Sequence, residues 1–192
     1  MTAIRGNSCG GRRGTALIAV LVVVLTACAP EREPAPGAGP PPAAPSRAAE
    51  NGSIPENESI SVDDSAHAAI ANLDPALLAA VRAAAADART RGVELKVTSG
   101  WRSAEYQQRL LDEAIALYRS EEEARKLVHP PEKSKHVTGQ AIDIGPTAAA
   151  DWLVQHGADY GLCQAYANEM WHFELLTTPG GRCPQPLSDA SG

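Results

Sequence analysis

The 192-residue sequence has few basic residues and no long basic cluster. It contains 17 Lys and Arg against 23 Asp and Glu, a formal net charge of −6 at pH 7. Proteins that bind nucleic acid neutralise phosphates with Lys and Arg, so an acidic chain is a poor candidate for that class. The same shortage argues against nonspecific adhesion to anionic lipid headgroups. The composition therefore predicts no nucleic-acid partner.

A hydrophobic run long enough to cross a bilayer is also missing from the N-terminal region. The apolar stretch at residues 15–26 has about twelve residues, whereas a spanning helix needs ~20. It follows Arg5, Arg12 and Arg13, and its length is typical of the apolar part of a secretory signal peptide. We therefore expect an exported protein, whether the segment is cleaved or stays as an uncleaved anchor.

The apolar stretch ends at Leu25-Thr26-Ala27-Cys28, which resembles the lipobox of bacterial lipoproteins. In that class the peptide before the cysteine is removed and the cysteine carries lipid. The resemblance implies a signal peptide at residues 1–27 and a membrane protein held by lipidated Cys28, facing the cell wall. A plain secretory signal is the alternative. Cleavage would leave 14 Lys and Arg against 23 Asp and Glu, a net charge of −9.

Cysteine is scarce, with four residues in the whole chain. Cys9 lies in the expected signal peptide and Cys28 is the expected lipidation site, which leaves Cys163 and Cys183. Two remaining cysteines in an exported domain most simply form one disulfide. Two free buried thiols are the alternative.

The chain has no evident internal repeat, and its composition divides it into a tether and one domain. Residues 28–61 are rich in Pro, Ala, Gly, Glu and Ser. Such a composition cannot bury enough apolar surface to offset chain entropy, so it predicts a disordered tether. Residues 62–192 remain, which is a normal size for one domain with one core.

Hydrophobic periodicity alternates along this domain. It predicts helices over residues 74–92, 103–128 and 148–157, and strands over residues 93–100, 140–145 and 169–176. Helices and short strands without regular β-α-β alternation favour an α+β domain with a small antiparallel sheet flanked by helices.

Four polar residues of the domain form a candidate metal site. A catalytic zinc site typically has three protein ligands and one open position for water. His136 and Asp143 flank Gly139, where a turn can aim both at one point, and His172 would come from a neighbouring strand. Glu169 precedes His172 by three residues, so its carboxylate can reach water without binding the metal.

Each of these residues also has a structural interpretation. A single His is more often a surface or core residue than a ligand, and Asp143 could cap an element or pair with Lys. Asp143, however, stands in a strand between two isoleucines, where a carboxylate is disfavoured and costly to bury unpaired. A metal or a strong partner would remove that cost. His67, His129 and His156 fit no pattern, and we expect them to be structural.

Three blocks of the domain resemble a known family. The stretches SGWRSAEYQ, SKHVTGQAID and EMWHFE are similar, in that order, to motifs of the zinc D-alanyl-D-alanine carboxypeptidases and dipeptidases of the VanY/VanX type. The second block fits S-x-H-x-x-G-x-A-x-D and the third fits E-x-W-H. Together the blocks extend over most of the predicted domain, and they imply the α+β fold called Hedgehog/DD-peptidase-like.

The resemblance also implies roles for individual residues. His136, Asp143 and His172 match the ligands of one Zn²⁺ ion, and Glu169 matches the catalytic base. Arg102 matches an arginine that holds the scissile carbonyl or the terminal carboxylate of the substrate. Residues expected to bind substrate are Ser134, Gln107, Trp101 and Trp171. Trp101 replaces a Tyr of the family, and Met170 stands where many members have Pro, which leaves substrate preference open.

The function implied by this resemblance is removal of the C-terminal D-Ala from peptidoglycan stem peptides. Within the family, a D,D-dipeptidase acting on free D-Ala-D-Ala or an endopeptidase cutting cross-links is the alternative. A non-catalytic peptidoglycan-binding module is a further alternative. Relatives of that kind lose the base or a ligand, whereas this chain retains all four residues.

Overall fold

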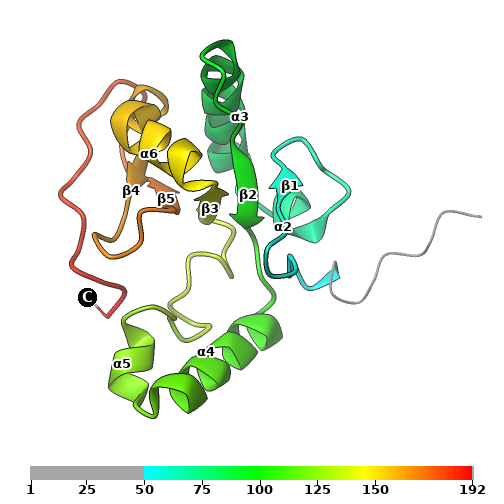
Figure 1. Ribbon diagram of the computed structural model, residues 1–192, viewed down its shortest axis with the longest axis vertical. Helices are drawn as coiled ribbons and strands as arrows, with labels where there is room; N and C mark the ends of the chain where they lie inside the picture. The colour runs from blue at the N-terminus through cyan, green and yellow to red at the C-terminus, as the bar shows by residue number, and fades with distance from the viewer. Residues whose placement is uncertain (1–49, 192) are drawn as a thin grey trace, which may run out of the picture. The chain divides into compact units, whose positions relative to one another are not determined.

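The computed structural model describes residues 50–191. Within this range one antiparallel sheet has the strand order β1-β2-β3-β5-β4 (Figure 1). Its strands are β1 (Ile60–Ser61), β2 (Lys96–Ser99), β3 (Ala141–Gly145), β4 (Leu162–Gln164) and β5 (His172–Leu175). The helices are α2 (Ala68–Ala71), α3 (Pro75–Thr90), α4 (Ala104–Tyr118), α5 (Glu121–Arg125), α6 (Thr147–His156) and the 3-10 turn η1 (Gly157–Tyr160). The predicted α+β class with a small antiparallel sheet is confirmed.

Helix α3 begins and ends where its sequence predicts. The Asp74 carboxylate accepts hydrogen bonds from the amides of Ala76 and Leu77, and Pro75 occupies the first helical position. Both features satisfy or remove amide groups that have no partner inside the helix. Gly92, just after the helix, has a φ of +75°, a conformation that glycine adopts without steric cost.

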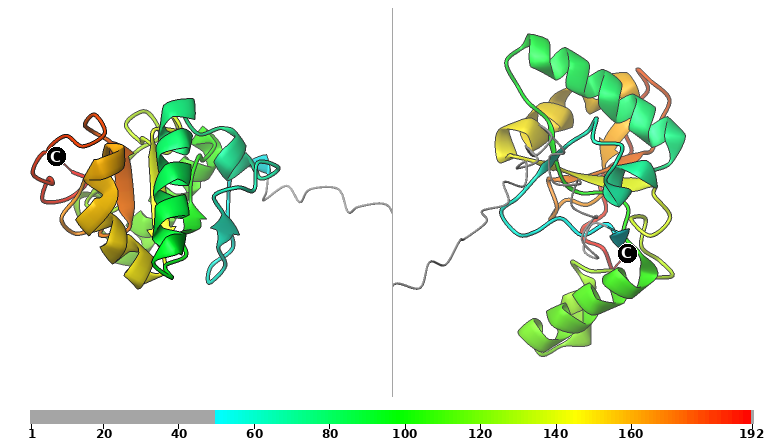
Figure 2. Two further views of the ribbon diagram at one scale, coloured as in Figure 1. Left: turned by 90° about the horizontal axis from the view of Figure 1, so that it is seen from above. Right: turned by 90° about the vertical axis from the view of Figure 1, so that its right-hand side faces the viewer.

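Helices α3 and α6 cover one face of the sheet (Figure 2). Strand side chains alternate between the two faces, and the core face carries Ile142, Ile144 and Phe173, all almost fully buried. Asp143 and His172 therefore point to the opposite face. The strand period thus separates the hydrophobic core from the polar residues of the candidate site.

The predicted helix over residues 103–128 is in fact two helices. Arg119 adopts a left-handed conformation with a φ of 54°, and Ser120 caps α5 by accepting a hydrogen bond from the amide of Glu123. The break lets α5 fold back on α4 around a small cluster that includes Leu111 and Ala124. The two helices lie at the bottom of Figure 1, away from α3 and α6. The serine cap and the gain in burial outweigh the continuous helical periodicity.

The folded domain begins before residue 62, which corrects the predicted tether boundary. Strand β1 pairs with β2, and the amide of Ser103 donates to the carbonyl of Asn51 at 2.9 Å. Ile54 and Ile60 pack against the hydrophobic core. Strand pairing and two partly buried isoleucines attach this stretch to the domain, although its average composition resembles a linker. The remainder of the predicted tether, the signal peptide and Cys28 lie outside the described residues.

Two strand predictions need shorter bounds. The strand predicted over residues 93–100 is β2, which begins at Lys96, and the one predicted over residues 169–176 is β5, which begins at His172. A turn precedes β5, closed by a hydrogen bond from the amide of His172 to the carbonyl of Glu169 at 3.2 Å. Glu169 is therefore placed on the turn that enters the strand. In residues 50–191 no helix is long and apolar enough to cross a membrane.

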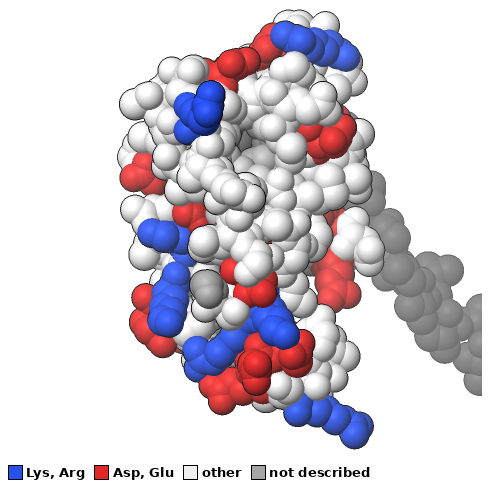
Figure 3. Space-filling model, turned by 90° about the vertical axis from the view of Figure 1, so that its left-hand side faces the viewer, with Lys and Arg blue, Asp and Glu red and all other residues white. Residues whose placement is uncertain are grey.

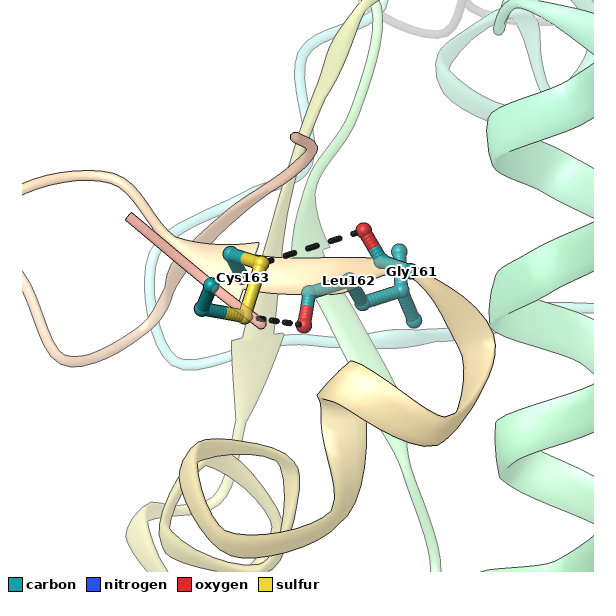
Figure 4. The surroundings of a disulfide bond; sticks show 4 residues. Gly161, Leu162 and Cys163 are labelled. Atoms are coloured by element: carbon teal, nitrogen blue, oxygen red, sulfur yellow. Dashed lines mark hydrogen bonds between the residues drawn. A yellow bond between two sulfur atoms is a disulfide. The ribbon is translucent and has the colours of Figure 1, made fainter. Parts of the chain in front are cut away.

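The predicted disulfide between Cys163 and Cys183 is confirmed (Figure 4). It joins β4 to the C-terminal segment, with the Cα atoms 5.6 Å apart and a sequence separation of 20. Beyond the bridge, the amide of Leu187 donates to the carbonyl of Ala165, and the amide of Ala190 donates to the carbonyl of Lys126. The bridge and these hydrogen bonds hold the C-terminal segment against the sheet and the end of α5.

Replacing both cysteines, as Cys163→Ser with Cys183→Ser, should lower the free energy of unfolding by about 3 kcal/mol, because the bridge restricts the unfolded chain. Urea unfolding of the domain measures the change, and the wild-type protein treated with reductant should show the same shift. A wild-type protein whose unfolding midpoint does not respond to reductant would contradict a stabilising bridge.

Candidate metal centre

Three buried side chains from separate parts of the chain meet on the open face of the sheet. Asp143 lies in β3 and His172 in β5, and the two residues are directly opposite each other in the antiparallel pairing. His136 reaches them from the loop that precedes β3. Their exposed fractions are 5% for His136, 6% for Asp143 and 4% for His172. One potential ligand atom of each residue lies within 4.8 Å of the other two.

The three ligand atoms converge on one point. His136 Nε2 lies 3.2 Å from His172 Nδ1 and 3.3 Å from Asp143 Oδ1, and His172 Nδ1 lies 3.1 Å from Asp143 Oδ1. Atoms bound to a tetrahedral zinc ion at ~2.0 Å are ~3.3 Å apart. Two imidazole nitrogens and one carboxylate oxygen are also a typical ligand set for catalytic zinc. The residues therefore fit a zinc ion.

The remaining ring nitrogens of both histidines have partners of their own. His136 Nδ1 lies 2.8 Å from the carbonyl oxygen of Gly100, and His172 Nε2 lies 3.1 Å from Glu174 Oε1. A histidine that binds a metal usually donates its other N–H to a carbonyl or carboxylate, which fixes the ring orientation. These contacts leave His136 Nε2 and His172 Nδ1 directed at the common point.

A tight turn at Gly139 brings His136 to the sheet, as the sequence predicts. Gly139 has a φ of +73°, and its carbonyl accepts a hydrogen bond from the amide of Asp74 at 2.8 Å. A Cβ atom at this position would collide with the carbonyl oxygen of Asn72. Glycine is required both by the backbone conformation and by the close approach of the two chain segments.

Arg102 is fixed beside the ligands by three side chains. It donates to Ser99 Oγ at 2.8 Å, to Gln107 Oε1 at 3.1 Å and to Asp143 Oδ2 at 3.0 Å. Gln107 is itself held by a hydrogen bond to the carbonyl of His129 at 2.8 Å. Arg102 thus orients the carboxylate of Asp143, and 15% of its side chain remains exposed, toward the cavity that it lines.

Glu169 lies beside the three ligands with one oxygen free. Its Oε2 is 3.8 Å from His172 Nδ1, whereas its buried Oε1 has no hydrogen-bond partner among the described residues. Burial raises the pKa of Glu169 to about 7, despite the opposing charge of His172. A carboxyl group in this state can both accept and release a proton near neutral pH.

The electrostatics of the cluster favour an ionised aspartate. Burial disfavours the charged form of Asp143, but His136 and His172 outweigh it and hold the pKa of Asp143 well below its usual range. Burial, together with the charge of Arg102, lowers the pKa of His136. Burial also opposes protonation of His172, yet Asp143 and Glu174 raise its pKa to about 9. Since a metal requires a deprotonated ring nitrogen, binding would release this proton.

A cavity of about 190 Å³ opens onto the cluster. Ser134 and Trp171 line it as the resemblance implies, and 43% of Trp171 is exposed at its edge. Gln107 lines it as well and supports Arg102. Trp101 does not line it, which corrects that expectation: its indole N–H donates to the carbonyl of Val137 at 3.1 Å, so this side chain braces the loop that carries His136.

The structure adds residues that the sequence did not identify. His129 was expected to be structural, yet it lines the cavity together with Tyr166. No local pattern marks either residue, because tertiary packing brings them there. Glu174 was identifiable, since it follows His172 by two residues on a strand and must share its face. By contrast, His67 caps α2 and His156 packs against Trp152, so both are structural as expected.

Comparisons with known proteins agree with this site. The model of the VanY family, described as D-alanyl-D-alanine carboxypeptidase, matches residues 70–177, which include all three candidate ligands and Glu169. A D-alanyl-D-alanine carboxypeptidase of Enterococcus faecalis is 30% identical over 114 residues, an alignment that covers 46% of this chain and 42% of the relative. The chain thus spans less than half the length of that protein.

Two solved structures share the fold. A VanY D,D-pentapeptidase from a VanB-type vancomycin-resistance cassette, in complex with Zn(II), has a TM-score of 0.53 and 24% identity, covering 65% of this chain and 83% of its own. The D,D-dipeptidase VanXYg, bound to a D-Ala-D-Ala phosphinate analogue, has a TM-score of 0.52 and 23% identity. The match covers 68% of this chain and 61% of the VanXYg chain. With the family match over more than half of its residues, the chain belongs to the VanY family of D-alanyl-D-alanine carboxypeptidases.

Proposed function

We propose that the protein is a zinc-dependent D,D-carboxypeptidase that removes the terminal D-Ala from peptidoglycan stem peptides. One observation carries the proposal: three converging ligand atoms, on His136, Asp143 and His172, lie beside the unpartnered buried oxygen of Glu169. A site of this kind combines a metal position with a proton acceptor. A Zn(II) complex of a VanY protein with this fold supports the choice of metal.

The chemistry divides between the metal and the chain. His136, Asp143 and His172 would hold the zinc ion, which would act as a Lewis acid on a carbonyl oxygen and would lower the pKa of water. Glu169 Oε1 accepts a proton from a water molecule while the oxygen of that water attacks the carbonyl carbon of the scissile bond. Glu169 then passes that proton to the nitrogen of the leaving D-Ala as the C–N bond breaks.

Arg102 supplies the fixed positive charge of the site. Its guanidinium lies at the cavity wall, already oriented by Ser99, Gln107 and Asp143. A guanidinium held in this way can bind the terminal carboxylate of the peptide or the oxyanion that develops during attack. Ser134 and Trp171 line the same cavity and are the proposed contacts for the terminal residues.

The size of the cavity supports a D,D-dipeptidase as a second candidate function. About 190 Å³ lies below the ~300–1,000 Å³ typical of ligand pockets, so the cavity takes only the end of a peptide or a free dipeptide. The fold is shared with VanXYg, a D,D-dipeptidase. A comparison of D-Ala release from free D-Ala-D-Ala and from a stem pentapeptide separates the two functions.

We further propose that the protein is exported and held on the outer side of the cell membrane by lipid on Cys28. The motif Leu25-Thr26-Ala27-Cys28 at the end of a short apolar stretch supports this. A disulfide in the domain agrees with an oxidising compartment. Peptidoglycan would be within reach of a domain anchored there.

The variant Glu169→Gln tests the proposed base. Release of D-Ala from a stem pentapeptide should fall by about 10²–10⁴-fold, because the amide cannot accept the proton, while the variant still binds one zinc ion per chain. Mass spectrometry of the peptides, with and without chelator, measures turnover. Glu132 is an exposed residue of the loop that precedes β3. The variant Glu132→Gln is the matched control and should behave as wild type. Wild-type rates for Glu169→Gln would refute the assignment.

The variant Glu174→Gln tests the support of His172. Loss of the carboxylate that faces Nε2 should weaken zinc binding by about 10–100-fold, as measured by competition with a chromogenic chelator. The exposed Glu113→Gln on α4 serves as the control and should keep wild-type affinity. An unchanged zinc affinity for Glu174→Gln would mean that Glu174 does not support the ligand.

The variant Cys28→Ser tests the anchor. Full-length protein expressed in a bacterium should partition into the detergent phase and incorporate radiolabelled palmitate, whereas Cys28→Ser should do neither, because it lacks the thiol that would carry the lipid. Cys9→Ser is the matched control and should remain lipidated. Recovery of the wild-type protein in the aqueous phase, unlabelled, would rule out a lipid anchor.

A further inference from the structure

A second cavity of about 360 Å³ adjoins the one at the candidate metal centre. The two cavities share His129, Lys135, Tyr166 and Ala190 in their walls. They are therefore neighbouring compartments of one depression rather than separate sites. A ligand that fills the first cavity can extend directly into the second.

The second cavity is lined by positive charge. Lys133, Lys135 and Arg125 lie in its wall, and no Asp or Glu among residues 50–191 does. This contrasts with the acidic composition of the chain as a whole. On the face drawn in Figure 3, Lys and Arg side chains gather over the lower part of the molecule, interspersed with acidic ones.

The two lysines have no acidic partner in the described part of the chain. Of the lysines there, Lys96 and Lys126 form ion pairs with glutamates. Lys133 forms no ion pair, and Lys135 donates only to the neutral amide oxygen of Gln140, at 3.2 Å. Arg125 differs, because its charge is shared with Glu121 at 2.7 Å. Lys133 and Lys135 are thus the charges of the cavity that form no ion pair, although Lys135 also borders a separate cavity lined by Asp74 and Glu174.

Both lysines lie in the loop that precedes β3 and carries His136. They flank Ser134, which is buried and lines the first cavity, while both lysines are exposed. His136 follows directly, and its buried ring is fixed by the carbonyl of Gly100. The anchoring of Ser134 and His136 therefore fixes the backbone from which both lysine side chains extend, beside the metal centre.

The geometry of a carboxypeptidase determines what enters the second cavity. The first cavity is too small for more than the end of a peptide, and the terminal residue is the one removed. Any part of the substrate that extends beyond the first cavity therefore lies on the N-terminal side of the scissile bond. The adjoining space is where this part continues, and its charge suits an anion.

We propose that the second cavity is a substrate subsite in which Lys133 and Lys135 bind a carboxylate on the N-terminal side of the scissile bond. The proposal rests on the proposed function and names its preferred substrate: an acidic peptide ending in D-Ala-D-Ala. Ion pairs of exposed lysines are individually weak and are screened by salt. The preference is therefore moderate and depends on ionic strength.

Two peptides that end in D-Ala-D-Ala test the subsite, one with Glu and one with Gln at the residue before this dipeptide. Binding is measured by calorimetry on the zinc-loaded Glu169→Gln variant, in which turnover is expected to be slow. The acidic peptide should bind about three- to tenfold more tightly at low salt. Its advantage should shrink at high salt.

Substitutions of the lysines locate the effect. Adding Lys133→Gln and Lys135→Gln should reduce the ratio of the two affinities to about one, whereas Lys133→Arg with Lys135→Arg should preserve it. Lys126→Gln is the matched control, since Lys126 is paired with Glu123 and does not line the second cavity. It should leave the ratio as in the parent protein. Thermal unfolding of each variant confirms that it is folded.

The outcomes separate the subsite from the reaction. Equal affinity of the two peptides, or a preference that survives Lys133→Gln with Lys135→Gln, overturns the subsite even if the wild-type enzyme releases D-Ala. Preferential binding that depends on both lysines supports it. If such binding is found and the wild-type enzyme releases no D-Ala, the proposed function fails while the carboxylate subsite stands.

Discussion

The buried carboxylate of Asp143 is the constraint around which the site is built. Its side chain lies in the sheet, where an unpaired negative charge is costly, and it is compensated by His136, His172 and Arg102. These partners come from a loop, a neighbouring strand and the segment after β2. The turn at Gly139 brings His136 to the aspartate, the pairing of β3 with β5 brings His172, and the pairing of β2 with β3 brings Arg102. Because all of them converge on one anion, the site would lose its charge balance if any one were displaced.

The alternation of strand side chains makes this arrangement compatible with a stable fold. Ile142 and Phe173 enter the core under α3 and α6, while their neighbours Asp143 and His172 face the opposite side. Core packing therefore fixes the register that places the two ligands opposite each other. Glu174 shares the face of His172 and completes its hydrogen bonding. Stability and ligand geometry come from the same strands without sharing side chains.

Sequence reasoning identified the parts that depend on local chemistry. A carboxylate between isoleucines, a glycine turn and the order of three motifs were enough to predict His136, Asp143, His172 and Glu169 as one cluster. What it missed depends on tertiary packing. The break at Arg119 follows from the folding of α5 onto α4, the position of Trp101 from its contact with Val137, and the position of His129 from the assembly of the cavity. The positions of Trp101 and His129 have no periodic or compositional signature, whereas the break before α5 is marked only by the Ser120 cap.

The C-terminal segment completes both cavities without contributing a candidate ligand. Ala190 lines both cavities, yet it lies beyond residues 70–177, the part that matches the family. The segment is attached by the bridge at Cys183 and by backbone hydrogen bonds at Leu187 and Ala190, and none of these involves the ligand-bearing parts of β3 and β5. A substitution in this segment therefore replaces none of the three candidate ligands, nor Glu169. One wall of the cavities and the candidate metal centre are thus carried by different parts of the chain, so the shape of the cavities can be altered separately from the ligand set.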